Sequence, residues 1–123
     1  MKPSERHTAD LSPDFTSRRR AIRLAAPPGL TVTLSDSRVH ARILDISHGG
    51  VGLLTNVPLA DGGSYLLTFR IGTRIATCSA RAAHVNKRPD DGWRAGMAFV
   101  QDEQIRRVEE IVDELIDGLV QFS

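Results

Sequence analysis

The feature that most constrains the fold is an alternation of apolar and polar residues with a period of two, which runs with interruptions from Leu30 to Val100. Successive side chains of a β-strand point to opposite faces, so this period is typical of strands that bury one face. Stretches rich in Gly, Pro, Asn and Asp separate the runs and indicate turns. The pattern predicts six strands, over residues 30–34, 39–43, 51–54, 65–71, 75–85 and 93–100.

The end of the chain changes to helical spacing. Asp102 is suited to cap the helix, and the apolar residues that follow recur every three or four positions, at Ile105, Val108, Val112, Leu115 and Leu119. Two further apolar residues off this stripe, Ile111 and Ile116, are expected to widen its contact with the core. A sheet of six short strands avoids exposed edges by closing on itself. The sequence therefore predicts a mainly β protein: a small six-stranded antiparallel barrel with a C-terminal amphipathic helix.

The chain length of 123 residues suits one domain. Residues 1–17 are polar and without periodicity, which predicts a disordered tail. The expected domain covers residues 18–120. It comprises a flexible N-terminal arm rich in arginine and ending in a Pro-Pro-Gly sequence, a barrel and a helix, over residues 18–29, 30–101 and 102–120.

Cysteine content and hydropathy indicate a cellular location. Cys78 is the only cysteine, so no intramolecular disulfide can form and a reducing compartment is expected. No apolar run approaches the roughly 20 residues that span a membrane, and the N-terminus lacks the apolar core of a secretory signal. We therefore expect a cytoplasmic protein without a membrane span.

Charge does not predict a nucleic-acid partner. The formal net charge is +1, and seven acidic residues gather between Asp102 and Asp117. One tryptophan and one tyrosine offer no platform for stacking single-stranded bases. Arginine nonetheless supplies 14 of the 16 basic residues, and arginine suits bidentate recognition of phosphate and base edges, although codon bias in a GC-rich genome is an equal explanation of the excess.

The sequence contains no set of residues with the pattern of a catalytic site. The four histidines are scattered without the spacing of metal ligands. Ser47 and His48 are adjacent, but neighbouring side chains of an extended segment point apart. Cys78 lies among alanines on an alternating strand, which predicts a buried and unreactive thiol. We expect no enzymatic activity, no metal and no cofactor.

Two short motifs remain. One is the cluster Arg19-Arg20-Ala21-Ile22-Arg23, and the other is Asp45-Ile46-Ser47-His48-Gly49-Gly50. Taken singly, they are explained by a solvated basic arm and an ordinary turn. Together they complement an anionic guanine nucleotide. A carboxylate accepts hydrogen bonds from the N1–H and N2–H edge of guanine, guanidinium groups bind phosphate or guanine O6 and N7, and a hydroxyl donates to either.

This pair of motifs resembles the signature of the PilZ domain family, RxxxR followed by (D/N)xSxxG. The sequences Val51-Gly52-Leu53 and Gly96-Met97-Ala98-Phe99 are also similar to the family, and the resemblance spans roughly residues 18–120. It implies a six-stranded barrel with a C-terminal helix, in agreement with the alternation pattern. It also implies binding of the bacterial second messenger cyclic di-GMP.

Carried over to this sequence, the resemblance assigns the ligand to Arg19, Arg20, Arg23, Asp45, Ser47 and Gly50. The arginines would contact phosphates and guanine, Asp45 and Ser47 would hydrogen-bond a guanine, and Gly50 would leave room for it. Arg18 is adjacent and is expected to help.

The expected function is that of a receptor. Cyclic di-GMP would order the arm, and the reshaped surface would pass the signal to an unidentified downstream protein. We expect a monomer or a weak dimer. The main alternative is a PilZ-like module that binds protein partners without a ligand, and nucleic-acid binding ranks below both.

Overall fold

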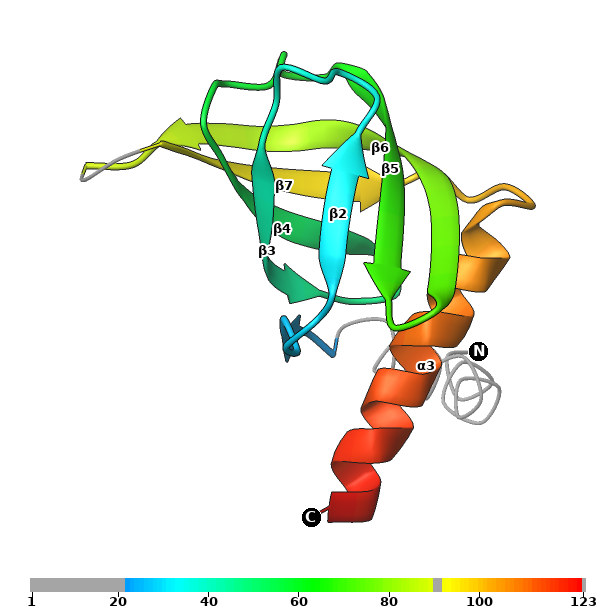
Figure 1. Cartoon of the computed structure of the whole chain (residues 1–123). Helices are drawn as coiled ribbons and strands as arrows, with labels where there is room; N and C mark the ends of the chain where they lie inside the picture. Colours follow the sequence, from blue (N-terminus) through cyan, green and yellow to red (C-terminus); the bar gives the residue numbers. More distant parts are fainter. Residues whose placement is uncertain (1–21, 90–91, 123) are drawn as a thin grey trace, which may run out of the picture.

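The computed structural model describes residues 22–89 and 92–122, with the side chains of residues 22–118. Within these residues, seven strands precede one helix (Figure 1). The elements in chain order are β1 (Leu24–Ala25), β2 (Thr31–Leu34), β3 (Ala41–Ile46), β4 (Gly50–Thr55), β5 (Ser64–Ile71), β6 (Arg74–Lys87), β7 (Trp93–Phe99) and α3 (Ile105–Phe122).

All seven strands belong to one antiparallel sheet in the order β1-β3-β4-β7-β6-β5-β2. Each of the six predicted strands is present, and the loop of Gly72 and Thr73 joins β5 to β6 as a two-residue hairpin. The expected number of six strands is corrected to seven, because β1 adds a short edge strand beside β3. The alternation pattern did not show β1, since a strand of two residues has no period.

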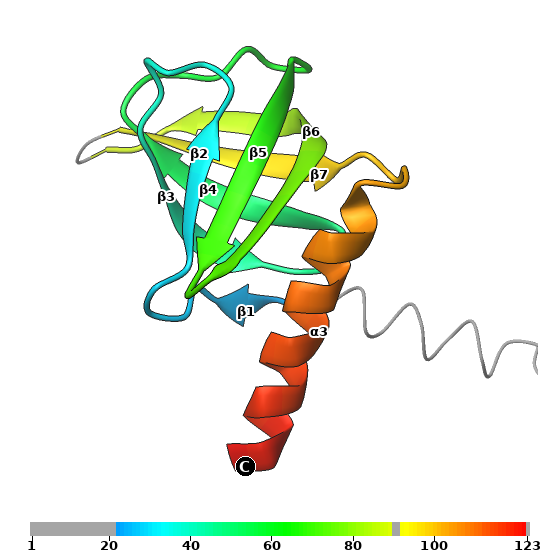
Figure 2. The same ribbon diagram turned by 45° about the vertical axis from the view of Figure 1, so that its right-hand side comes forward.

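The sheet curls so strongly that β2 stands in front of β4 and β7 (Figure 1). β2 and β3 lie side by side in both Figures 1 and 2 and are in contact. Within the described ranges, however, no hydrogen-bonded ladder joins them, and the sheet ends at β1 and β2. The structure is therefore a curled sheet rather than a barrel that is hydrogen-bonded all round.

The inner face of the curled sheet forms the core. The alternating apolar residues of β2, β5 and β6 point inward, and Phe69 meets Phe99 edge to face with ring centroids 6.0 Å apart. The largest side chains that are fully buried belong to Ile46, Val51, Leu53, Leu67, Phe69, Cys78, Val108 and Val112. Because every second side chain points inward and the sheet is curled, the inward side chains form one continuous core.

The helix α3 packs against β6 and continues beyond the sheet (Figure 2). It begins at Ile105, three residues after the predicted start. Asp102 lies just before the helix and accepts hydrogen bonds from the amides of Gln104 and Ile105. Ile111 and Ile116 are buried, which confirms that they widen the core contact. No helix in the described part of the chain is long and apolar enough to cross a membrane.

The single cysteine lies inside the sheet. Cys78 is fully buried, as its position among alanines predicted. Burial raises the pKa of the thiol to about 12, and the negative charge of Asp102 adds to the rise. Because thiol reactivity depends on the thiolate, Cys78 is a packing residue.

Candidate functional site

A β-bulge in β3 decides where Asp45 points. The alternation of Ala41 and Ile43 would place Asp45 on the buried face. The register shifts between Ile43 and Asp45, so that Leu44 is the extra residue, Ile46 enters the core and Asp45 faces outward. Asp45 therefore belongs to a strand, which corrects the expectation that it lies in a turn.

The ladder between β1 and β3 brings the first motif to the second. Leu24 is opposite Ile46 and Ala25 is opposite Asp45, which places Arg23 on the same outer face as Asp45. The Arg23 guanidinium donates a hydrogen bond from Nη1 to Oδ1 of Asp45 at 2.9 Å. Residues that are 22 positions apart in the sequence are thus in direct contact, as convergence of the two motifs requires.

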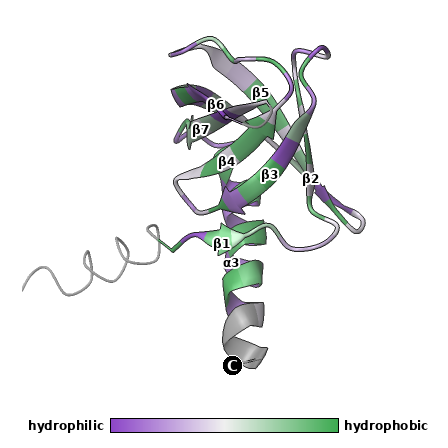
Figure 3. Ribbon diagram, turned by 90° about the vertical axis from the view of Figure 1, so that its left-hand side faces the viewer, coloured by the Kyte–Doolittle hydropathy of each residue, from purple (hydrophilic) through white to green (hydrophobic). Residues whose placement is uncertain are grey.

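A second arginine approaches the same carboxylate from β7. Nη2 of Arg94 lies 3.8 Å from Oδ2 of Asp45, the oxygen that Arg23 does not bind. Below the carboxylate is Gly52, the partner of Asp45 in the ladder, where an added Cβ would lie 2.7 Å from Oδ1. The missing side chain of Gly52 leaves the space that the Asp45 carboxylate occupies beside the two guanidinium groups. Figure 3 faces this side of the molecule, with β1, β3, β4 and β7 toward the viewer.

The turn after Asp45 is held by its own hydrogen bonds. The Ser47 hydroxyl donates to the carbonyl of Gly50 and accepts from the amide of Gly49, both at 3.3 Å, and the Ser47 amide donates to the same carbonyl at 2.9 Å. Ser47 is buried, with 4% of its surface exposed. Its hydroxyl shapes the turn, and its contact with a ligand stays a prediction.

Gly50 has a structural reason of its own to be glycine. An ideal Cβ at this position would lie 2.1 Å from the carbonyl oxygen of Met97 on the neighbouring strand β7. Gly50 is buried and pairs with Ala98. The close approach at Gly50 is therefore made by the backbone of β7, and the space expected there for a ligand remains a prediction.

The turn is also tied to the helix. Nε2 of His48 donates to Oδ1 of Asp113 on α3 at 2.8 Å, and the His48 side chain is only 9% exposed. The residue between Ser47 and Gly49 thus anchors the second motif to an element 65 positions away.

We expect His48→Ala to lower the free energy of unfolding by about 1–2 kcal/mol, because the variant loses this hydrogen bond and the packing of a buried ring. His40→Ala is the matched control, since the His40 side chain is exposed and its amide contact with Asn56 is made by the backbone. Urea denaturation of both variants measures the difference. Equal midpoints for the two variants would contradict a stabilising role for His48.

The family model for the PilZ domain matches residues 17–116. The chain belongs to the PilZ family. A search of curated proteins finds no sequence that matches this PilZ chain.

Two solved structures are similar to this PilZ domain. The crystal structure of YcgR from Escherichia coli in complex with c-di-GMP matches with a TM-score of 0.63 and 25% identity, over 85% of this chain and 46% of the YcgR chain. The crystal structure of the uncharacterised Legionella protein Lpg0364 matches with a TM-score of 0.58 and 16% identity, over 79% of this chain and 96% of that one. This chain therefore spans slightly less than half of the YcgR chain.

The structure brings together those PilZ signature residues that it describes. Arg23 contacts Asp45, and Ser47 and Gly50 form the adjoining turn. The predicted residues Arg18, Arg19 and Arg20 lie outside the described residues.

Arg94, Gly52 and His48 were not predicted to belong to this site. Sequence alternation marks Arg94 as an outward residue of the last strand. Only the order of strands, with β7 next to β4, places it beside Asp45.

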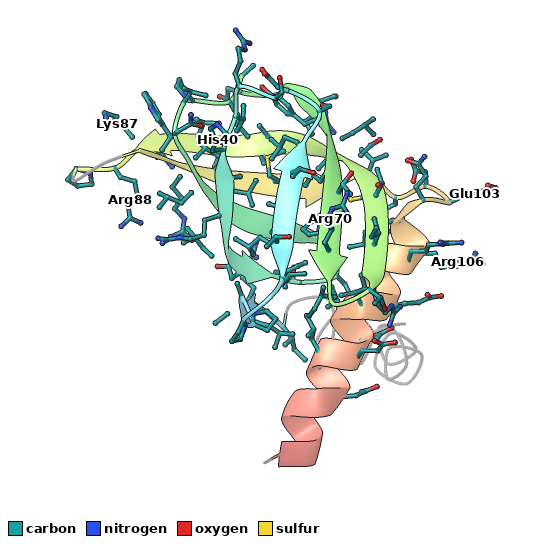
Figure 4. The ribbon with its side chains drawn as sticks, viewed as in Figure 1. His40, Arg70, Lys87, Arg88, Glu103 and Arg106 are labelled. Carbon is teal, nitrogen blue, oxygen red and sulfur yellow. The ribbon has the colours of Figure 1, made fainter. Side chains whose placement is uncertain are left out.

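A pocket of about 490 Å³ lies at the other end of the β3–β4 hairpin. Its lining combines the apolar side chains of Ala41 and Leu54 with basic and polar ones, which include His40, Arg42, Asn56 and Arg88. Figure 4 labels His40, Lys87 and Arg88 at this end. Of the predicted site residues that the structure describes, Arg23, Asp45, Ser47 and Gly50, none lines this pocket.

Proposed function

We propose that this PilZ domain binds cyclic di-GMP on the outer face of β1 and β3, and that it acts as a receptor without a reaction of its own. The observation that carries the proposal is the 2.9 Å contact between Arg23 and Asp45, which joins the RxxxR motif to the DxSxxG motif. The likeness to YcgR, solved with c-di-GMP, supports the choice of ligand.

The Arg23–Asp45 ion pair contributes little free energy, so a ligand can replace it at small cost. The side chains are 52% and 24% exposed, and an ion pair of this kind contributes about 0–1 kcal/mol. A hydrogen bond to a charged group is worth about 1.5–3 kcal/mol. Exchanging one such pair for several bonds to phosphate and guanine is therefore favourable.

Each group then has a role that matches its chemistry. The Asp45 carboxylate accepts hydrogen bonds from N1–H and N2–H of a guanine, and Arg23 is released to bind a phosphate. Arg19 and Arg20 precede Arg23 by four and three positions, and we assign them to the second phosphate and to a guanine. Ser47 and Gly50 complete the site from the turn.

Titration with cyclic di-GMP tests this function, with cyclic di-AMP as the control ligand. Adenine lacks the N1–H and N2–H donors that Asp45 would bind, so only the guanine nucleotide should bind tightly. Linkage predicts that ligand at 100 times its Kd stabilises the fold by about 2.7 kcal/mol. If neither calorimetry nor thermal denaturation detects cyclic di-GMP, the domain is a ligand-independent interaction module.

We further propose that the ligand transmits its signal through residues 18–23. These residues immediately precede β1, which pairs with Asp45 and Ile46, so a ligand bound to Asp45 fixes the chain on both sides of Arg23. The ordered segment would then present a new surface to a cytoplasmic protein partner. Backbone ¹⁵N relaxation should show residues 18–23 stiffening as cyclic di-GMP is added, and unchanged relaxation in the saturated domain would refute this route.

A further inference from the structure

Arg94 occupies a central position on the outer face of the sheet. It is the second residue of β7, the central strand of the sheet, and is paired with Leu54 of β4 on one side and with Asn86 of β6 on the other. Its neighbour Ala95 is fully buried, while the Arg94 side chain is 52% exposed. The backbone of Arg94 is thus held by two ladders, and its guanidinium group is accessible to a ligand.

The position of this guanidinium relative to Asp45 indicates an anion site. Arg23 and Arg94 approach different oxygens of the same carboxylate, at 2.9 Å and 3.8 Å. Two guanidinium groups and one carboxylate carry a net charge of +1. When a guanine takes the hydrogen bonds of Asp45, both guanidinium groups become available to the same ligand.

The two arginines differ in how far they are preorganised. Arg23 stands before a strand of two residues at the edge of the sheet, whereas Arg94 belongs to a seven-residue strand in its interior. Ordering a side chain on a fixed backbone costs less entropy than ordering the backbone as well. The next outward residue on this strand is Gly96, where an added Cβ would be in van der Waals contact with the His84 side chain, 3.6 Å away.

We propose that Arg94 is a further ligand-binding residue, which contacts a phosphate of the guanine dinucleotide from β7. This inference rests on the proposed function and deepens it. It extends the site from the edge strand β1 and its neighbour β3 across β4 to β7. The contact lies outside both sequence motifs.

The test is calorimetric titration of Arg94→Gln with cyclic di-GMP. We expect Kd to rise at least fivefold. Arg70→Gln is the matched control, because Arg70 is an exposed strand arginine on β5, which stands in front of β4 and β7 (Figure 4). The control should bind within twofold of the unmodified domain. Binding by the unmodified domain together with unchanged binding by Arg94→Gln would overturn the role of Arg94, whereas no binding by the unmodified domain would overturn the proposed function itself.

A double-mutant cycle separates direct contact from an effect through Asp45. If Arg94 only positions the carboxylate, its replacement should have no further effect in the Asp45→Asn background. If Arg94 contacts phosphate, Arg94→Gln should weaken binding about as much in that background as in the unmodified domain. Loss of the effect in the Asp45→Asn background would overturn direct contact.

Discussion

Arg23→Ala is expected to weaken cyclic di-GMP binding at least about tenfold, which corresponds to about 1.4 kcal/mol. The variant removes the guanidinium group that joins the two motifs and that would bind a phosphate. Asp45→Ala should have a similar effect, because its partners in the bound state are ligand atoms. Calorimetric titration of each variant measures the loss.

The fold should be almost unaffected by these changes. The Arg23–Asp45 pair is partly exposed, so its loss removes about 0–1 kcal/mol of stability. Arg38→Ala is the matched control. Arg38 pairs with Asp36 at the same 2.9 Å, but in the loop that precedes β3, at the opposite end of that strand from Asp45. Unchanged affinity in both Arg23→Ala and Asp45→Ala would refute the assigned site.

Gly50→Ala is expected to destabilise the fold by about 3 kcal/mol, the upper part of the range for overpacking. The new methyl group would lie 2.1 Å from the Met97 carbonyl oxygen, and both backbones are held in the β4–β7 ladder. Relief requires separating two interior strands. Denaturation by urea without ligand measures the effect.

Gly49→Ala in the same turn is the control, because nothing lies within 4 Å of its added Cβ and the residue is exposed. This comparison separates the two explanations of Gly50. A purely ligand-accommodating glycine would give an alanine variant with normal stability and reduced affinity for cyclic di-GMP. A packing glycine gives a variant that unfolds at a lower denaturant concentration before any ligand is added.

The alternation of residues was sufficient to predict the strands of the core. Phe69, Cys78 and Ala80 each lie between polar residues, and all three are buried. Turn residues were similarly informative at Gly72 and Thr73. Such patterns are local, and each strand carries enough residues to show its own period.

The bulge at Leu44 could not be predicted from the alternation pattern. An extra residue in one strand is defined only against its partner, and here the partner is β4. Without the bulge, a strict period of two would bury Asp45. The sequence therefore indicated a break at the correct place but not that the strand continues through it.

The sequence predicted the two motifs of the candidate site, but not which other residues the fold brings beside them. Their residue types indicated a guanine nucleotide, and the contact of Arg23 with Asp45 confirms that these two motif residues converge. Arg94 carries no motif and becomes a candidate only when β7 is known to lie beside β4. His48 likewise gives no sign in the sequence of its partner on α3.

The ladder between β1 and β3 has a consequence for how such domains diverge. Two residue pairs, and not the length of the intervening chain, set Arg23 beside Asp45. Insertions or deletions in the loops on either side of β2 would leave this neighbourhood intact. A shift of the β1 register by a single residue would instead turn Arg23 to the other face of the sheet. Evolution is therefore free to vary the number of residues between Arg23 and Asp45, but not the register in which β1 pairs with β3.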